Sequence, residues 1–220
     1  MLIVIQARSD SKRFPQKIYS KIKNKTLLEN IIDNLSDLNF KICVCSTNRS
    51  IDKKIKFISK KKNCLFFAGP KNNVLKRIYE CGAKFGADEI IRINGDSPLI
   101  SKYLLLKALE YKKKNLKYDI ISNVYPRTFP KGMSVEIIKL KCLKKIISMN
   151  LSKSNKEHVT EYIYDNPNFF VIKNFKLAKN FSKINLSVDT KKDLIFVRKK
   201  QKLFSNIRNY KELINKIYKL

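Results

Sequence analysis

The sequence predicts an α/β fold in which a mostly parallel, Rossmann-like sheet is covered by helices and carries a smaller β-rich insertion. Short apolar runs alternate with helical patterns through residue 123, an order typical of a parallel sheet with crossover helices. Strand patterns interrupted by short helices then follow up to residue 189. The 220 residues contain no linker, repeat or low-complexity tract, so we expect a single domain.

Five apolar runs up to residue 123 have the length and composition of buried strands. These predicted strands are Leu2–Gln6, Lys41–Ser46, Cys64–Ala68, Glu89–Asn94 and Asp119–Asn123. Helical spacing of apolar residues predicts helices over 27–35, 51–60, 74–85 and 101–114. Thr26 and Glu29 have capping-box spacing at the first helix, and Gly86 is expected to end the third.

The second half predicts a less regular series of elements. The expected strands are Met133–Ile138, Phe169–Phe175 and Ile184–Val188. The expected helices are Leu140–Asn150, Glu157–Asp165, a helix from Thr190 to about Leu203, and a terminal helix Tyr210–Leu220.

The net charge is +30, from 48 Lys and Arg against 18 Asp and Glu. Such a charge favours nucleic acid as a partner. The lysines, however, occur in every segment from Lys12 to Lys219 and do not gather in one tail or stripe. We therefore expect a composition bias with no specific nucleic-acid partner, and a surface that attracts anionic substrates.

No stretch approaches the ~20 apolar residues that a membrane helix needs, and Leu2–Ile5 is too short for a signal-peptide core. The sequence thus predicts a cytoplasmic protein without a membrane partner. None of its five cysteines has C-x-x-C spacing. Cys43 and Cys45 alternate along a predicted strand, so we expect them to be small buried hydrophobic residues.

A basic loop follows the first predicted strand directly, over residues 6–17. In open parallel sheets, ligands bind beyond the carboxyl ends of the strands. Arg8, Arg13 and Lys17 therefore lie where a ligand is expected, and guanidinium and ammonium groups bind phosphate oxygens. The loop's small serines allow backbone N–H groups to approach an anion. A solvated basic loop is the alternative interpretation.

Two predicted strands end in aspartates. Asp96 follows a buried strand and Gly95, and Asp189 follows the strand pattern 184–188. Mg²⁺ usually takes one or two carboxylates together with substrate phosphates and water, so the pair predicts a metal site. For Asp96 a turn or helix cap is the alternative. Thr190 is the better cap of the last long helix, and Asp193 completes its capping box.

These motifs together resemble the signature of the sugar-activating cytidylyltransferases. The patterns are Q-A-R-x-x-S-[KT]-R-x-P-x-K at residues 6–17, G-D-x-P-L-I at 95–100 and V-D-T-x-x-D-L at 188–194. The resemblance extends from Ile3 to Leu194 and is greatest for the spore-coat polysaccharide type, related to the acylneuraminate and 3-deoxy-manno-octulosonate enzymes. It implies a glycosyltransferase-A-like nucleotidyltransferase fold.

The activity implied by this resemblance is the Mg²⁺-dependent transfer of CMP from CTP to a sugar acid or related sugar, with release of pyrophosphate, for surface polysaccharide or glycoconjugate synthesis. It implies catalytic roles for Arg13, Lys17, Asp96 and Asp189, of which the two aspartates bind the metal. The implied nucleotide-binding residues are Gln6, Ala7, Arg8, Ser11, Arg13, Lys17, Ser46, Thr47, Asn94 and Asp96.

The acceptor side of the resemblance includes P-R-T-F-P-x-G-x-x-V-E at residues 126–136 and E-H-V-T at 157–160. It implies acceptor-binding roles for Arg127, Glu136 and His158. The chain departs from the family at Asp10, where Gly is usual, and at Ser134, where Asp is more frequent. Residues 1–123 would form the nucleotide-binding portion, 124–189 the acceptor side and a dimerisation portion, and 190–220 the C-terminal helices.

Two alternatives remain open at this stage. One is a nucleotidyltransferase of the same fold that uses another nucleoside triphosphate or a sugar 1-phosphate. The other is a basic nucleic-acid-binding protein, which only the net charge favours. The acceptor sugar is undetermined, and a homodimer is one open assembly.

Overall fold

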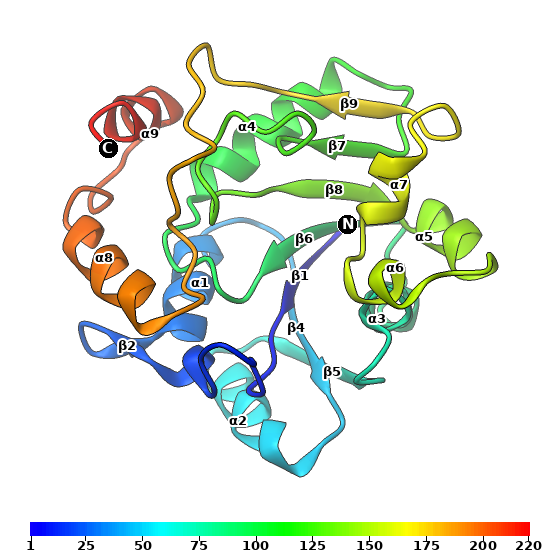
Figure 1. The fold of residues 1–220 in the computed structure, drawn as a ribbon, viewed down its shortest axis with the longest axis horizontal. Coiled ribbons are helices and arrows are strands. Elements are labelled where there is room, and N and C mark those ends of the chain that lie inside the picture. Colours follow the sequence, from blue (N-terminus) through cyan, green and yellow to red (C-terminus); the bar gives the residue numbers. More distant parts are fainter.

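A computed structural model describes all 220 residues (Figure 1), and its centre is a seven-stranded sheet. Its strands are β1 (Leu2–Gln6), β4 (Ile42–Thr47), β5 (Leu65–Gly69), β6 (Glu89–Asn94), β7 (Ile120–Ser122), β8 (Glu136–Lys139) and β9 (Ile172–Asn174). They lie in the order β5-β4-β1-β6-β8-β7-β9. Only β8 runs antiparallel to its neighbours, so the predicted mostly parallel α/β fold is confirmed.

The helices are α1 (Leu27–Leu35), α2 (Lys53–Lys61), α3 (Val74–Lys84), α4 (Lys102–Lys113), α5 (Leu140–Ile147), α6 (Lys153–Glu157), α7 (Glu161–Asp165), α8 (Lys191–Gln201) and α9 (Tyr210–Ile217). Two 3₁₀ turns, Lys17–Tyr19 and Ser50–Asp52, and a small hairpin of β2 (Lys21–Ile22) and β3 (Lys25–Thr26) complete the fold. Both predicted capping boxes form, at α1 and α8. None of the helices has the length and apolar character that would let it cross a membrane.

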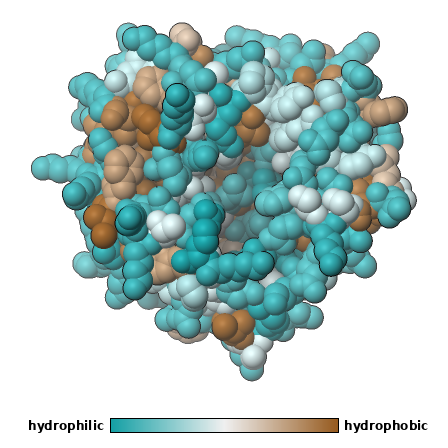
Figure 2. All heavy atoms as spheres, viewed as in Figure 1, coloured by the Kyte–Doolittle hydropathy of each residue, from teal (hydrophilic) through white to brown (hydrophobic).

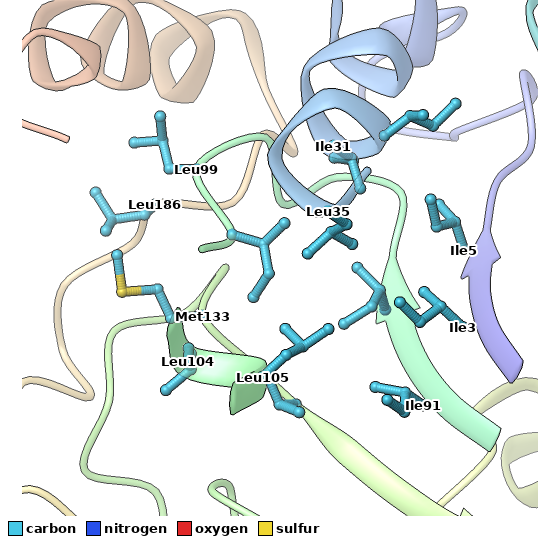
Figure 3. Packing of buried hydrophobic residues seen from close by; sticks show 14 of the residues in the cluster. Ile3, Ile5, Ile31, Leu35, Ile91, Leu99, Leu104, Leu105, Met133 and Leu186 are labelled. Carbon is cyan, nitrogen blue, oxygen red and sulfur yellow. The ribbon is translucent and has the colours of Figure 1, made fainter. Parts of the chain in front are cut away.

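Apolar side chains alternate between the two faces of the sheet and form two cores. Ile3 and Ile5 of β1 belong to a cluster of 36 buried residues, and Leu2 and Val4 belong to a cluster of 19 on the opposite face. Helices α1, α4, α8 and α9 pack on the first face, and α3 and α5 on the second. Figure 3 shows α1 side chains pointing toward β1. The predicted burial of Cys43 and Cys45 is confirmed.

The predicted single helix Glu157–Asp165 was wrong. Helix α6 begins earlier, after the capping residue Ser152, and ends at Glu157. The chain leaves helical geometry at His158, whose φ and ψ are −100° and 89°. The break lets Val159 enter the second core, where it is almost fully buried, and helix α7 begins only at Glu161.

The predicted strand Ile184–Val188 was also wrong as a member of the sheet. The segment is extended but makes only an isolated bridge, from Asn185 to Lys131.

The predicted strand Met133–Ile138 begins later, at Glu136. The reason is that the Asn123 side chain pairs with the Met133 carbonyl and the Val135 N–H, at 2.8 and 2.9 Å, in place of a backbone ladder.

Candidate active site

Three chain segments meet where β1 and β6 end. The Gly95 N–H donates to the Gln6 carbonyl at 2.8 Å, and a Cβ at Gly95 would lie 2.5 Å from that oxygen. Only glycine fits this approach without a backbone shift. The Val188 N–H donates to the Asp96 carbonyl at 2.8 Å. These two contacts bring residues about 90 positions apart to one point, so that Asp189 lies beside Asp96.

A second glycine holds the extended segment in place. Gly132 has φ +88°, and a Cβ there would lie 2.6 Å from the backbone of Leu186 and Ser187. Lys131, beside it, exchanges hydrogen bonds with this segment: its N–H donates to the Ile184 carbonyl and its carbonyl accepts from the Leu186 N–H. The missing side chain therefore allows the segment that ends in Asp189 to lie directly on the 131–132 turn.

Lys17 lies between the two aspartates. Its Nζ donates to Asp189 Oδ1 at 2.8 Å and to Asp96 Oδ2 at 3.3 Å. Arg13 Nη2 lies 2.9 Å from the other oxygen of Asp189, and Arg8 pairs with Glu157 at 2.7 Å. The three predicted phosphate-binding cations thus each face a carboxylate in the free protein.

These residues line a pocket of about 390 Å³. Its lining includes Gln6, Ala7, Arg8, Ser11, Arg13, Lys17, Asn94, Asp96 and Asp189, all predicted from the sequence. Figure 2 shows that the face seen in Figure 1 is hollowed near its centre, with mainly hydrophilic residues around the rim. Ser46 and Thr47 are buried and do not line this pocket; Thr47 instead hydrogen-bonds to Asp52 beneath the loop.

A second pocket of about 390 Å³ lies beside the first. Both are lined by Arg92, Asn94 and His158. The break between α6 and α7 puts His158 at this boundary. Arg127 and Glu136 line the second pocket only, so all three predicted acceptor residues gather in one place.

Arg127 has an incomplete set of partners. Its Nη2 donates to Ser134 Oγ at 3.0 Å, whereas its Nη1 is buried without a partner. Burial lowers the pKa of this guanidinium, and the nearby Glu136 and Tyr164 partly offset the effect. Glu136 itself is engaged on both oxygens, by Arg92 and by the Tyr164 hydroxyl. Arg127 is therefore the group in this pocket with an open charged donor.

A sequence profile of the family described as cytidylyltransferase matches residues 2–218. The chain belongs to the cytidylyltransferase family.

Proteins with a similar sequence or a similar fold agree with this assignment. A cytidylyltransferase structure from Leptospira borgpetersenii is 30% identical, with a TM-score of 0.91 over 99% of this chain and 93% of that one. The spore coat polysaccharide biosynthesis protein SpsF of Bacillus subtilis is 24% identical over 88% of this chain and 82% of its own. CMP:2-keto-3-deoxy-manno-octonic acid synthetase, solved in complex with CTP, shares the fold at 15% identity, with a TM-score of 0.69 over 91% of this chain and 98% of that one.

The two aspartates fit a divalent cation that binds together with a nucleotide. Oxygens of both already converge on one positive charge, the Lys17 ammonium. No third His, Cys, Asp or Glu joins them, so a metal here would need substrate oxygens and water to complete its shell. This is the coordination that Mg²⁺ adopts in phosphate-transfer sites.

Sequence reasoning did not single out four charged residues in or around this site, of which only Arg92 lines the two pockets. Arg92 and Arg77 each interrupt an apolar pattern, one in strand β6 and one on the buried side of α3. A charged residue at a position that an apolar pattern predicts to be buried is rare, so both arginines could have been marked from the sequence as candidates for a functional role. Asp52 and Arg49 gave no signal, because a polar pair before a helix usually forms a solvated turn.

Proposed function

We propose that this cytidylyltransferase transfers CMP from CTP to a sugar acid or related sugar and releases pyrophosphate. The observation that carries the proposal is the convergence of Asp96, Asp189 and Lys17 beside a second pocket that contains the open Arg127 guanidinium. The first pocket has the charges for a triphosphate, and the second has a donor for an anionic acceptor.

On the nucleotide side, the cations would exchange partners when CTP binds. Arg8, Arg13 and Lys17 leave their carboxylates and hold phosphate oxygens, which stabilises the negative charge of departing pyrophosphate. Asp96 and Asp189 would hold Mg²⁺, which neutralises the α-phosphate and orients the attacking oxygen when bound. The residues position the reactants in line, since nucleotidyl transfer asks little covalent chemistry of the protein.

For the base we propose Arg77. This side chain is fully buried; its Nη1 donates to the Pro70 carbonyl at 2.6 Å, while Nε and Nη2 have no partner. Burial lowers the pKa of this guanidinium, and the positive charge of the nearby Arg8 lowers it further. A guanidinium matches the adjacent N3 and O2 acceptors of cytosine, whereas uracil presents an N3–H donor. Arg77→Lys is then expected to reduce the preference for CTP over UTP.

On the acceptor side, Arg127 would bind the carboxylate of a sugar acid. A buried guanidinium that lacks an anionic partner gains a strong, charge-assisted hydrogen bond when a carboxylate enters. His158 and Asn94 line both pockets, where the acceptor hydroxyl must meet the α-phosphorus.

The direct test is pyrophosphate release with each of the four nucleoside triphosphates, Mg²⁺ and a panel of sugar acids and matched neutral sugars. We expect turnover with CTP and a carboxylate-bearing acceptor. Equal turnover with all four nucleotides would remove CTP from the proposal. Release that depends on a sugar 1-phosphate instead would favour the other nucleotidyltransferase reaction.

A further inference from the structure

Asp52 is a completely buried carboxylate on the 3₁₀ turn Ser50–Asp52. It lies beneath the basic loop of residues 6–17, called the phosphate loop below. One of its oxygens accepts from both the N–H and the hydroxyl of Ser9, at 2.8 and 2.6 Å. The other accepts from the Thr47 hydroxyl and from Arg49 Nη2, the latter at 3.0 Å. Four donors, two from the loop after β1 and two from the end of β4 and the turn after it, thus meet on one side chain that does not line the nucleotide pocket.

Ser9 is fixed from both sides. While its N–H and hydroxyl bind Asp52, its carbonyl accepts from the Gln16 N–H at 2.7 Å. That bond closes residues 9–16 into a loop. Gln16 adopts left-handed geometry, with φ 57°, and the next residue is Lys17. The position of Ser9 therefore sets where the cations on either side of the closed loop, Arg8 and Lys17, are presented.

Arg49 extends the same network to Asp10. Arg49 Nη1 lies 2.5 Å from Asp10, while Nη2 binds Asp52. Lys71 approaches the Asp10 carboxylate at 3.5 Å and Arg8 approaches it at 3.8 Å. The negative charge that Asp10 adds to the phosphate loop is thus balanced by cations outside the closed loop.

We propose that Asp52 and Arg49 are positioning residues that hold the phosphate loop in its triphosphate-binding shape before the nucleotide arrives. The inference rests on the proposed function in that it takes the loop to bind a triphosphate. A loop that is already ordered pays less conformational entropy on binding, and its cations need no rearrangement beyond exchange of partners.

A purely structural role would favour a different side chain. Hydrogen bonds and an ion pair only partly offset the free energy cost of burying a carboxylate, and well-packed apolar side chains in place of such a buried pair are often as stable or more stable. All the partners of Asp52 lie in segments that follow β1 or in the end of β4 and the turn after it, the edge of the sheet where the nucleotide pocket opens. The arrangement therefore serves the loop.

Calorimetric titration with inorganic tripolyphosphate tests the loop without the base or the acceptor. Ser9→Ala removes one hydrogen bond to Asp52, and Asp52→Asn removes the charge that Arg49 needs. We expect affinity to fall at least threefold for Ser9→Ala and about tenfold or more for Asp52→Asn, as for lost hydrogen bonds to a charged group. Amide hydrogen exchange of residues 7–17 should become faster in both variants.

Ser59→Ala is the matched control. Ser59 is buried like Ser9, and its hydroxyl donates to the Ile55 carbonyl at 2.8 Å within α2, away from the loop. It should leave tripolyphosphate affinity and the hydrogen exchange of residues 7–17 unchanged. Wild-type affinity in Ser9→Ala, or an equal loss in Ser59→Ala, would overturn the proposal. If Asp52→Asn does not fold, Ser9→Ala decides alone, since it removes only one hydroxyl.

The two proposals fail differently in this experiment. If tripolyphosphate binds and the Ser9→Ala loss appears while CTP is not preferred, the nucleotide assignment fails and the positioning role stands. If CTP turns over normally in the loop variants, with unchanged KM for CTP, the positioning role fails and the proposed reaction stands. If wild-type protein binds neither ligand, both fail.

Discussion

The Lys17 ammonium lies between Asp96 and Asp189, the two residues that we propose bind Mg²⁺. Arg13 neutralises the remaining oxygen of Asp189. A cation that displaces Lys17 would leave the ammonium unpaired, and a triphosphate alone would leave the aspartates unpaired. The triphosphate would pair with the Lys17 ammonium that the metal displaces, and the metal would pair with the aspartates that Lys17 leaves. Binding of the metal and binding of the triphosphate are therefore expected to strengthen each other.

Replacing either aspartate should abolish most turnover without unfolding the protein. Asp96→Asn and Asp189→Asn keep the side-chain shape but remove the charge that binds a hard cation, and we expect a loss of about a hundredfold or more in kcat. Raised Mg²⁺ should restore part of it. Steady-state kinetics beside thermal melts provide the measurement.

Asp33→Asn is the matched control for these variants. The Asp33 side chain is 26% exposed, against 27% for Asp96 and 25% for Asp189, and it pairs with two lysines away from the site. Turnover near that of Asp33→Asn in either metal-site variant would show that the active site has been misplaced. Asp193 is a poor control, because it caps α8 as predicted but also accepts from the Asp189 N–H at 3.0 Å.

Ser134 accepts a hydrogen bond from Arg127 but carries no negative charge. A carboxylate at position 134 should therefore form an ion pair with the guanidinium. Ser134→Asp is expected to form an internal ion pair and raise KM for an anionic acceptor about tenfold or more, with KM for CTP unchanged. Ser134→Asn, similar in size and neutral, should retain most of the affinity. An unchanged KM in Ser134→Asp would remove Arg127 from acceptor binding.

Among the secondary-structure elements, the errors of sequence prediction fall where tertiary contacts replace local hydrogen bonds. The spacing of Glu157–Asp165 suits a helix, yet burial of Val159 breaks it. The apolar alternation of Ile184–Val188 suits a strand, yet its partners are a turn and the Asp96 carbonyl. Periodicity reports which side chains are buried, but not which backbone lies next to them. The strands of the main sheet and the α-helices up to residue 123, with local caps and continuous patterns, were predicted closely, but the short hairpin of β2 and β3 was not predicted.

Gly95 should be required where the ends of β1 and β6 meet, whereas Gly86, which lies in open space, should not be required for activity. Gly95→Ala places a methyl group against the Gln6 carbonyl and should separate the loop from Asp96, reducing turnover with CTP at least about tenfold. Gly86→Ala also strains the backbone, at φ +63°, but meets no atom within 4 Å. It should cost about 1 kcal/mol of stability and leave kcat unchanged. Equal kinetic losses in the two variants would argue against the junction.

Across the whole molecule, several carboxylates pair with cations or accept hydrogen bonds at the first turn of a helix. These contacts make the stability of the fold depend on pH in the acidic range. Burial alone would raise their pKa values, but hydrogen bonds and nearby cations outweigh it, so the pKa is lowered for Asp10, Glu29, Asp33, Asp52 and Asp193. Because the unfolded chain binds protons more readily, these groups stabilise the fold above about pH 4. That stability is lost as pH falls through their lowered pKa values.

Urea unfolding between pH 7 and pH 3 should therefore show a nearly constant free energy of unfolding down to about pH 5 and a decline below about pH 4. Asp52→Asn should be less stable at pH 7 and should decline less on acidification. A parallel decline in the two proteins would mean that Asp52 keeps an ordinary pKa when folded.

The candidate site was predictable from the sequence to the extent that its residues directly face the two pockets. Arg13, Lys17 and Asp189 end or follow predicted elements, which placed them at the sheet edge. Asp52 could not be found in this way, because its role depends on Ser9, 43 positions earlier in the chain. The contact between Asp52 and Ser9 depends on how the segments after β1 and β4 pack together, and a single sequence does not show which buried polar groups are in contact.

The antiparallel direction of strand β8 affects how the two pockets are built. Because it runs against its neighbours, its first residue, Glu136, pairs with Arg92 at the edge of the sheet where the parallel strand β6 ends. The proposed nucleotide pocket is thus built mainly from segments that leave the sheet, and the proposed acceptor pocket partly from a segment that enters it. Glu136 itself reaches the loop of residues 6–17 through Arg92, which donates to Gln6. Arg127 and Ser134 line the second pocket only, so we expect substitutions there to alter the proposed acceptor preference while the proposed triphosphate contacts are kept.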